Sequence, residues 1–301
     1  GVVEVTQDRS LDLLAVGTKD TSINDVDYTL AAIYRIDAKK GNSFDLDHAK
    51  INNTIVHPFY FKSSFSSSDA NVRFTGIDVM ADNKYYVARS GPDNNTSKPG
   101  GPDDAMLLFN NHDEFKTPIS VTTSQGFHRD YFKDPTSVST VMKPPQSFNV
   151  NESEDFIFSS RSPERSLKVQ YIELVQAKHG KSYEVKDMPQ DTSKANGFLL
   201  TSDRFNDPSD VTYTGDGTNY IFVTDAKKDS LYQFTNTGLE GIQPPPGSNK
   251  DKNIIASFGG SGSGPKSFRN PHGVAYFKEV VYVADKGNGR VLRFKLTTDF
   301  E

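Results

Sequence analysis

Histidine is the side chain best suited to exchange protons or bind a metal ion near neutral pH, and the chain has six of them. His272 follows Pro271 and stands at the start of a run that is typical of a β-strand. An imidazole in that place could bind zinc or hydrogen-bond a ligand. The other five histidines show no metal-ligand spacing: His48, His57, His112, His128 and His179. His272 is therefore a candidate binding residue, whereas the six histidines together define no metal site.

Aspartate residues form the second group of candidates. Asp78 and Asp210 each stand near the start of a strand-like run, where a carboxylate could hold a metal ion or act in glycan hydrolysis. A third acidic residue in an equivalent place is lacking, and the Gly-x-Ser-x-Gly elbow of a serine hydrolase is absent. We therefore keep Asp210 as a binding candidate and assign no catalytic residue. The cofactor stays open: the stretches DVDY, DLDH and GPDD could give oxygen ligands to Ca²⁺, although none has EF-hand spacing.

Arginine residues are the third group, because a guanidinium binds carboxylate or sulfate groups in a bidentate manner. Arg89 and Arg161 each come at the end of a β-rich run, where we expect a loop to open. Both are candidates for binding an anionic group of a ligand. Asp225 and Asp285 also end such runs, in VTD and VAD. We expect these two carboxylates to accept N–H groups of the following turn and so to be structural.

Composition excludes several classes of protein. Lys and Arg number 34 and Asp and Glu 39, so the net charge is 34 − 39 = −5, which disfavours nucleic acid as a partner. The absence of cysteine removes disulfides and thiolate metal sites. No apolar run approaches the roughly 18 residues that cross a bilayer, so we expect no transmembrane segment. The abundance of Phe and Tyr, 21 and 13 residues, together with polar turn residues favours an all-β protein.

A repeat is visible in three heptads of the form Phe-x-Asp/Asn-Pro-x-x-Val. They are FKDPTSV from Phe132, FNDPSDV from Phe205 and FRNPHGV from Phe268. Each heptad is followed by a β-branched and aromatic run, a polar turn and an alternating run. Because Pro fixes φ and lacks an N–H, Pro135, Pro208 and Pro271 are expected just before equivalent inner strands.

Two further copies can be traced toward the N-terminus, one at residues 76–91 and a looser one at residues 3–20. HPFYFKS, PISVTT and IIASFG recur between copies and are expected to be outer strands. Four antiparallel strands repeated around an axis make a propeller blade. We therefore predict one β-propeller domain over residues 1–301, with units near 1–65, 66–125, 126–200, 201–260 and 261–301; six blades are the alternative to five. The last blade should take its fourth strand from the N-terminal segment or lack it.

The stretch NPHGVAYFKEVVYVADKGNGRVLRF resembles the repeat of the NHL family of β-propellers, as does the preceding SFGGSGSGPKSF. The match is strong over about 40 residues of the last unit and fair at 205–234. Some propellers of that family are lyases that bind zinc through three histidines on different blades. Here the equivalent places carry Gly76, Thr136 or Ser137, and Ser209 or Asp210, so only His272 matches that set.

The resemblance implies two functions. The first is a non-enzymatic binding or scaffold propeller, monomeric and exported from a bacterial cell, whose loops on one face hold a peptide, glycan or protein. The long inserts favour this extracellular form, which would be periplasmic, lipoprotein-like at the cell surface, or secreted. The alternative is a metal-dependent enzyme of the central channel: a lyase, a lactonase or a glycan hydrolase.

Overall fold

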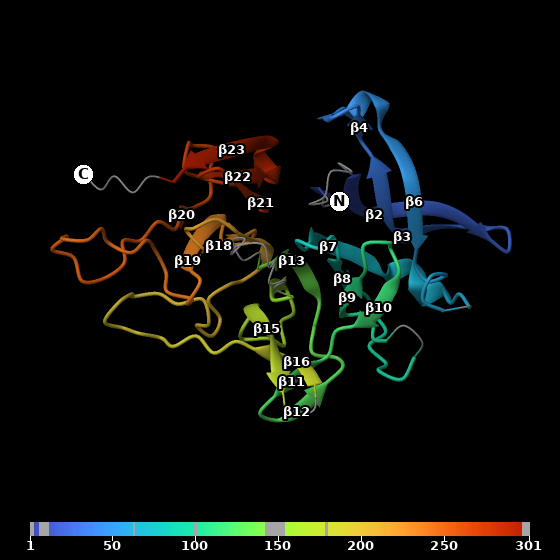
Figure 1. Cartoon of the computed structure of the whole chain (residues 1–301), viewed down its shortest axis with the longest axis horizontal. Helices are drawn as coiled ribbons and strands as arrows, with labels where there is room; N and C mark the ends of the chain where they lie inside the picture. Colours follow the sequence, from blue (N-terminus) through green and yellow to red (C-terminus); the bar gives the residue numbers. More distant parts are fainter. Residues whose placement is uncertain are drawn as a thin grey trace. The chain divides into compact units, whose positions relative to one another are not determined.

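The structure is a computed structural model that describes residues 3–5, 12–62, 64–98, 101–141, 154–177 and 180–296 (Figure 1). In these residues the regular structure is β-strand with three short 3₁₀ helices: η1 (Leu46–His48), η2 (Ser67–Asn71) and η3 (Lys286–Asn288). The prediction of an all-β chain is confirmed. By contact density the chain divides into two compact units. Unit 1 comprises Gly1–Thr140, Glu152–Glu154 and Leu174–Glu184, and unit 2 comprises Val141–Asn151, Asp155–Glu173 and Val185–Glu301.

Unit 1 contains two complete four-stranded antiparallel sheets. The first has the order β1 (Val3–Val5), β2 (Asp12–Ile23), β3 (Val26–Asp37) and β6 (Lys50–Val56). A small hairpin, β4 (Lys39–Lys40) and β5 (Ser43–Phe44), follows β3. The second sheet runs outward from β7 (Arg73–Val79) through β8 (Tyr85–Ser90) and β9 (Ala105–Phe109) to β10 (Phe115–Pro118).

The third sheet has strands in both units. Unit 1 holds β11 (Val121–Thr123), β12 (Gly126–His128), β13 (Pro135–Thr140) and nearly all of β16 (Gly180–Val185). Unit 2 holds β14 (Phe156–Ser160) and the first half of β15 (Val169–Ala177). β15 is an extended strand of nine residues.

Unit 2 contains the last two sheets. The fourth has the order β17 (Pro208–Tyr213), β18 (Tyr220–Asp225), β19 (Ser230–Thr235) and β20 (Phe258–Gly259). The fifth has three described strands, β21 (Pro271–Phe277), β22 (Val280–Asp285) and β23 (Arg290–Lys295). These sheets make the fold a five-bladed β-propeller, as predicted.

The three heptads place a proline at the start of an inner strand and a buried phenylalanine just before it. Pro135, Pro208 and Pro271 are each the first residue of an inner strand. In β17 and β21 the pairing register shifts directly after this proline, which marks a β-bulge. The heptad phenylalanines are 0%, 2% and 0% exposed at Phe132, Phe205 and Phe268. Each heptad therefore buries its phenylalanine ring in the core and begins an inner strand at its proline.

Hydrogen bonds between neighbouring inner strands show that Pro135 and Pro271 occupy equivalent positions. The hydroxyl of Thr75, in the bulge of β7, donates to the carbonyl oxygen of Pro135 over 2.7 Å. The hydroxyl of Ser209, in the bulge of β17, donates to the carbonyl oxygen of Pro271 over 2.8 Å. Both bonds join one inner strand to the next at the same place in the repeat.

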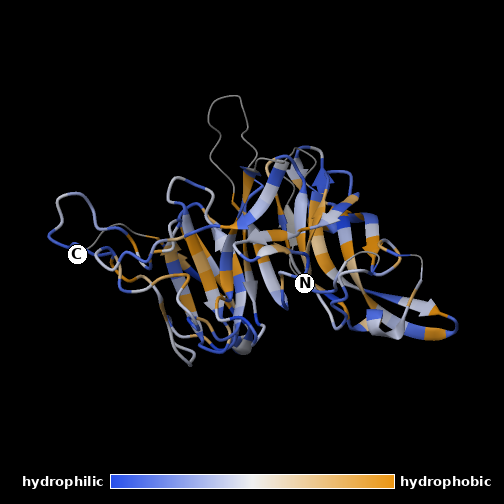
Figure 2. Cartoon of the chain, turned by 90° about the horizontal axis from the view of Figure 1, so that it is seen from below, coloured by the Kyte–Doolittle hydropathy of each residue, from blue (hydrophilic) through white to orange (hydrophobic). Residues whose placement is uncertain are grey.

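The cores lie between successive sheets, and Figure 2 shows hydrophobic residues gathered along the strands with hydrophilic residues along the loops. In unit 1, residues of β2 and β3 pack against residues of β7, β8 and β9. In unit 2, one cluster joins β14 and β15 to the fourth sheet, and a second joins the fourth sheet to the fifth. Burial of this apolar surface is the main force that holds the blades together.

Some predicted outer strands are wrong. The outer strand of the first sheet is β6, and residues 57–61 of the HPFYFKS segment after it form a turn. In PISVTT, Pro118 ends the second sheet while Val121–Thr123 joins the third. Only IIASFG supplies the strand expected of it, β20. β1 pairs with β2 in its own sheet, so these residues do not supply a fourth strand to the last blade.

Candidate functional site

Asp210 lies in β17, and its carboxylate joins two inner strands. Oδ1 accepts from the N–H of Val211 at 2.9 Å and Oδ2 from the N–H of Val274 in β21 at 2.7 Å. Asp78 does the same in unit 1, where its Oδ2 accepts from the N–H of Thr140 at 2.6 Å. Burial raises the pKa of Asp78 to about 6, against the opposing effect of these N–H donors. Both aspartates therefore hold neighbouring strands.

Asp225 and Asp285 are fully buried and hold the heptads, as the sequence predicted for structural carboxylates. Asp225 accepts from the N–H of Asn206 at 2.6 Å and also from the turn N–H of Lys228 at 3.0 Å. Asp285 accepts from the N–H of Arg269 at 2.7 Å and from Arg290 Nε at 2.8 Å. Each carboxylate thus joins the end of the second strand to the residue that lies two positions before the heptad proline.

His272 and Arg161 are exposed residues of unit 2. His272 occupies the bulge of β21, and Arg161 directly follows β14, as expected. Partial desolvation and the positive charges of Lys286 and Arg161 lower the pKa of His272. The structure therefore brings His272 and Arg161 into electrostatic reach of each other, and their role in binding stays a prediction.

Arg89 is not at a loop opening, because it lies inside β8 and is 1% exposed. In its blade Arg89 has the position that Asp225 and Asp285 have in theirs. The strand pairing shows this for Asp285: Ala88, directly before Arg89, pairs with Gly76, and Ala284, directly before Asp285, pairs with Gly273. Its guanidinium donates to the carbonyl oxygens of Asp103 and Pro102 at 3.1 and 2.6 Å. Burial lowers the pKa of Arg89 to about 10.

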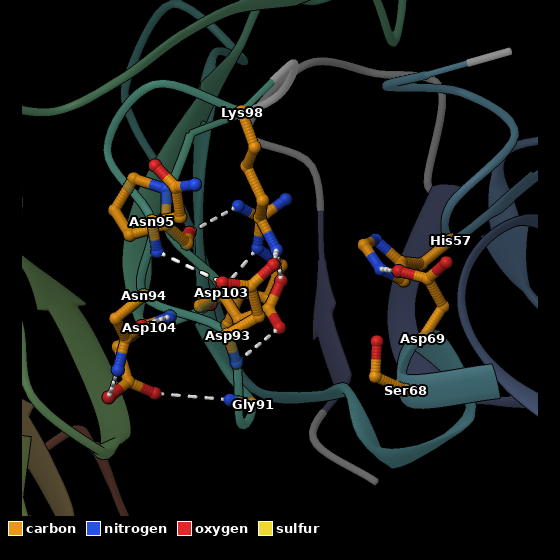
Figure 3. Close-up of polar contacts among 12 residues, drawn as sticks. His57, Ser68, Asp69, Gly91, Asp93, Asn94, Asn95, Lys98, Asp103 and Asp104 are labelled. Carbon is orange, nitrogen blue, oxygen red and sulfur yellow. Dashed lines mark hydrogen bonds and ion pairs between the residues drawn. The ribbon is translucent and has the colours of Figure 1, made fainter. Parts of the chain in front are cut away.

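The described residues of the loop between β8 and β9 carry charges of their own, on Asp93, Lys98, Asp103 and Asp104 (Figure 3). Lys98 forms an ion pair with the buried carboxylate of Asp103, and its ammonium lies 3.4 Å from Asp93. Asp104 accepts from the N–H of Gly91 at 3.1 Å and from the Asn94 amide at 2.9 Å. The acidic GPDD segment, a Ca²⁺ candidate in the sequence, is thus bound internally to a lysine, an amide and backbone N–H groups.

His57 and Asp69 lie on the other side of Figure 3 and were not singled out by the sequence. Both are buried, at 3% and 2% exposure, and His57 Nε2 lies 3.4 Å from Asp69 Oδ1. Neither ring nitrogen of His57 has a hydrogen-bond partner in the described residues. Burial, with the charge of Arg89, lowers the pKa of His57 to about 3. Burial alone would raise the pKa of Asp69, but hydrogen bonds from Lys62 and Ser66 hold it below its usual value.

A groove of about 920 Å³ lies in unit 2. It lies at the end of blade four that carries the β17–β18 turn, where Tyr220 pairs with Thr235. Asp210 and Asp225 lie toward the opposite end of the same sheet. The lining is mostly polar and comes from four separate segments: Ser193 and Lys194; Thr218 and Tyr220; Thr235, Asn236, Thr237 and Leu239; and Gln243, Pro244, Pro245 and Lys250–Asn253.

One wall of the groove is a loop that is closed at its base. Ile242 and Ile254 exchange two backbone hydrogen bonds of 2.9 and 2.8 Å. Gly241 precedes this bridge with a φ of 91°, and a Cβ there would lie 2.4 Å from the carbonyl oxygen of Ile254. Glycine is therefore required for the loop to close. Asn253 N donates to the carbonyl oxygen of Lys194 at 2.7 Å, which joins two of the lining segments.

Among the described residues, no three His, Asp or Glu side chains lie close enough together to hold a metal ion. Among the same residues, no helix has the length and apolar character to cross a membrane.

Comparison with known sequence families matches residues 268–294 to the family described as NHL repeat. This segment contains β21, β22 and β23, the whole described fifth sheet except its last residue. The chain contains an NHL repeat and folds as a five-bladed β-propeller. The resemblance drawn from the sequence is thus confirmed. No curated protein matches this NHL-repeat chain.

Several solved structures are similar to this NHL-repeat propeller. One is a nidogen/laminin complex, at 12% identity and a TM-score of 0.39, covering 94% of this chain and 89% of the other. Another is an auxiliary nutrient binding protein from Bacteroides thetaiotaomicron, at 10% identity and a TM-score of 0.48, covering 97% of this chain but 57% of the other. A third is a luciferin-regenerating enzyme, at 9% identity and a TM-score of 0.45, covering 95% and 84%.

Proposed function

We propose that this NHL-repeat propeller is a non-enzymatic binding protein that holds a glycan or peptide ligand in the groove of blade four. The single observation that carries the proposal is the groove itself, about 920 Å³ in volume and lined by side chains of four segments. Its size falls in the range of about 300 to 1,000 Å³ that is usual for small-ligand sites. Loops placed on a rigid sheet are a common location for binding residues.

The hydrogen bonds of Asp210 in β17 and Asp225 at the end of β18 also support a binding role. Asp210 accepts from Val211 and Val274, and Asp225 accepts from four backbone N–H groups. Carboxylates held in this way stabilise blades and are not free to take part in a reaction. The groove lies at the other end of the fourth sheet, so ligand binding there would leave the blade contacts intact.

The proposal includes a single propeller domain that works as a monomer, exported from a bacterial cell. The exported location rests on the long inserts, which set the repeat units apart from the compact repeats of the family, and on the acidic balance and absence of cysteine, which disfavour the RNA-binding form of the family. Size-exclusion chromatography with light scattering tests the monomer, and localisation of the protein in its source cell tests export.

Binding to glycan and peptide arrays tests the function. Labelled full chain should bind at least one ligand, and Asn236→Trp, which fills the groove from an exposed position, should abolish that binding. Lys227→Trp is the matched control, because Lys227 is exposed and does not line the groove. Binding that survives Asn236→Trp, or no binding at all, would refute the proposal. Stoichiometric Ca²⁺ or Zn²⁺ in the purified protein together with turnover of a lactone, peptide or glycan would favour the metal-dependent enzyme instead.

A further inference from the structure

The groove carries an excess of positive charge although the chain as a whole is acidic. Its lining has three lysines, Lys194, Lys250 and Lys252, against one acid, Asp251, while the net charge of the chain is −5. Lys252 donates to Asn196 at 2.7 Å. Lys194 and Lys250 are exposed, and their ammonium groups have no hydrogen bond or ion pair in the described part of the chain. Two ammonium groups are therefore available to a ligand.

The neutral lining suits a ligand dense in hydroxyl groups. Amides are supplied by Asn236, Gln243 and Asn253, and hydroxyls by three threonines and a serine. Such groups act as both donors and acceptors, which matches the hydroxyls of a sugar.

Flat apolar surfaces complete the lining. Tyr220 is half-buried with its ring packed edge to face on Phe222, which fixes the ring. Pro244 and Pro245 are rigid and line the same groove. Rigid rings and pyrrolidine faces can contact the C–H face of a pyranose without loss of side-chain entropy.

We propose, on the basis of the proposed function, that the groove binds an acidic oligosaccharide, with uronate or sulfate groups paired to Lys194 and Lys250. An acidic peptide would also pair with the lysines, but it would need acceptors and donors in the spacing of a strand or an apolar anchor pocket. The lining instead offers scattered hydroxyls and amides with small flat apolar faces. The observations therefore favour a glycan over a peptide.

Calorimetric titration of the full chain tests the inference. The probes are tetragalacturonate, tetramannuronate and a chondroitin sulfate tetrasaccharide, with neutral galactotetraose and tetraglutamate for comparison. At least one acidic oligosaccharide should bind at least about tenfold more tightly than the neutral sugar and the peptide, since a hydrogen bond to a charged group contributes about 1.5 to 3 kcal/mol. Binding should weaken as salt is raised, because exposed charges are screened.

The double variant Lys194→Gln/Lys250→Gln should lower that affinity at least about tenfold without unfolding, because both residues are exposed. Lys227→Gln/Lys266→Gln makes the same change of charge at two exposed positions outside the groove and should bind as the unmodified chain does. Equal binding of the neutral sugar, equal or tighter binding of tetraglutamate, or equal losses in both double variants would overturn the inference. If a ligand of the arrays binds the unmodified chain but not Asn236→Trp, and no acidic sugar binds, the proposed function stands and this inference fails.

Discussion

The carboxylate of Asp210 accepts a hydrogen bond from the backbone N–H of Val274, 64 positions later in the chain, at 2.7 Å. Asp78 makes the same contact with the N–H of Thr140, 62 positions later, at 2.6 Å. A β-strand normally satisfies its N–H groups within its own sheet. Here a side chain of one blade satisfies an N–H of the next, so that the register between blades is fixed by hydrogen bonding as well as by apolar packing.

Removing this contact should cost stability. Asp210→Ala deprives the N–H groups of Val211 and Val274 of their partner, and Val274 is buried. We expect the free energy of unfolding to fall by about 1 to 3 kcal/mol, as for an unsatisfied buried donor. Urea unfolding followed by circular dichroism measures it. Asp251→Ala, at an exposed position, should change stability by less than about 0.5 kcal/mol; equal losses in the two variants would contradict the role of Asp210.

Gly76 occupies the position of Asp210 in the repeat but has no room for a side chain. A Cβ at Gly76 would lie 2.8 Å from Ser137 Cα and 3.0 Å from Val138 N, both of them backbone atoms. Gly76→Ala should therefore destabilise the chain by about 1 to 3 kcal/mol through overpacking. Gly217→Ala is the control, because a Cβ there meets nothing within 4 Å and the residue has no positive φ. Thermal unfolding should separate the two; a neutral Gly76→Ala would show that the blades can move apart at low cost.

Arg89 should be essential for the order of the loop between β8 and β9. Arg89→Met removes a buried charge and leaves the carbonyl oxygens of Pro102 and Asp103 without their donor. A buried acceptor that loses its donor costs about 1 to 3 kcal/mol of stability. Limited proteolysis should then cut within residues 91–104 before any other segment. Arg161→Met, an exposed change, should leave the digestion pattern unaltered, and protection of the loop in Arg89→Met would argue against this role.

The parts of the fold that could be predicted are those with a repeated physical cause. The heptad recurs because Phe fills a core position and the proline starts a strand. Asp134 and Asn270 take positive φ angles of 38° and 51°, which Asp and Asn tolerate better than most residues. The outer strands have no such constraint. β20 and β11 are two and three residues long, and their composition does not differ from that of the neighbouring loops.

The site was harder to predict because its residues share no pattern. Arg89 was expected at a loop because it precedes Ser90 and a Pro/Gly-rich stretch, yet the strand continues to Ser90. The tetrapeptides YVAR, FVTD and YVAD align Arg89 with Asp225 and Asp285. This alignment could have shown that Arg89 is buried, as the two aspartates are. The groove draws its lining from segments between Ser193 and Asn253 that come together only in the folded chain.

The buried His57 should make stability depend on pH. Burial lowers its pKa to about 3 in the folded chain, while an unfolded chain takes up the proton near pH 6.5. Between these values the unfolded state binds more protons, so the free energy of unfolding is undiminished above about pH 6.5 and falls as pH is lowered toward 3, by at most about 1.4 kcal/mol per unit. Urea unfolding of the unmodified chain and of His57→Leu, measured from pH 7.5 to 4.5, tests this. The variant should lose less stability on acidification, because other acid-sensitive groups are common to both chains. Parallel pH profiles would mean that His57 is protonated in the folded chain as readily as in the unfolded one.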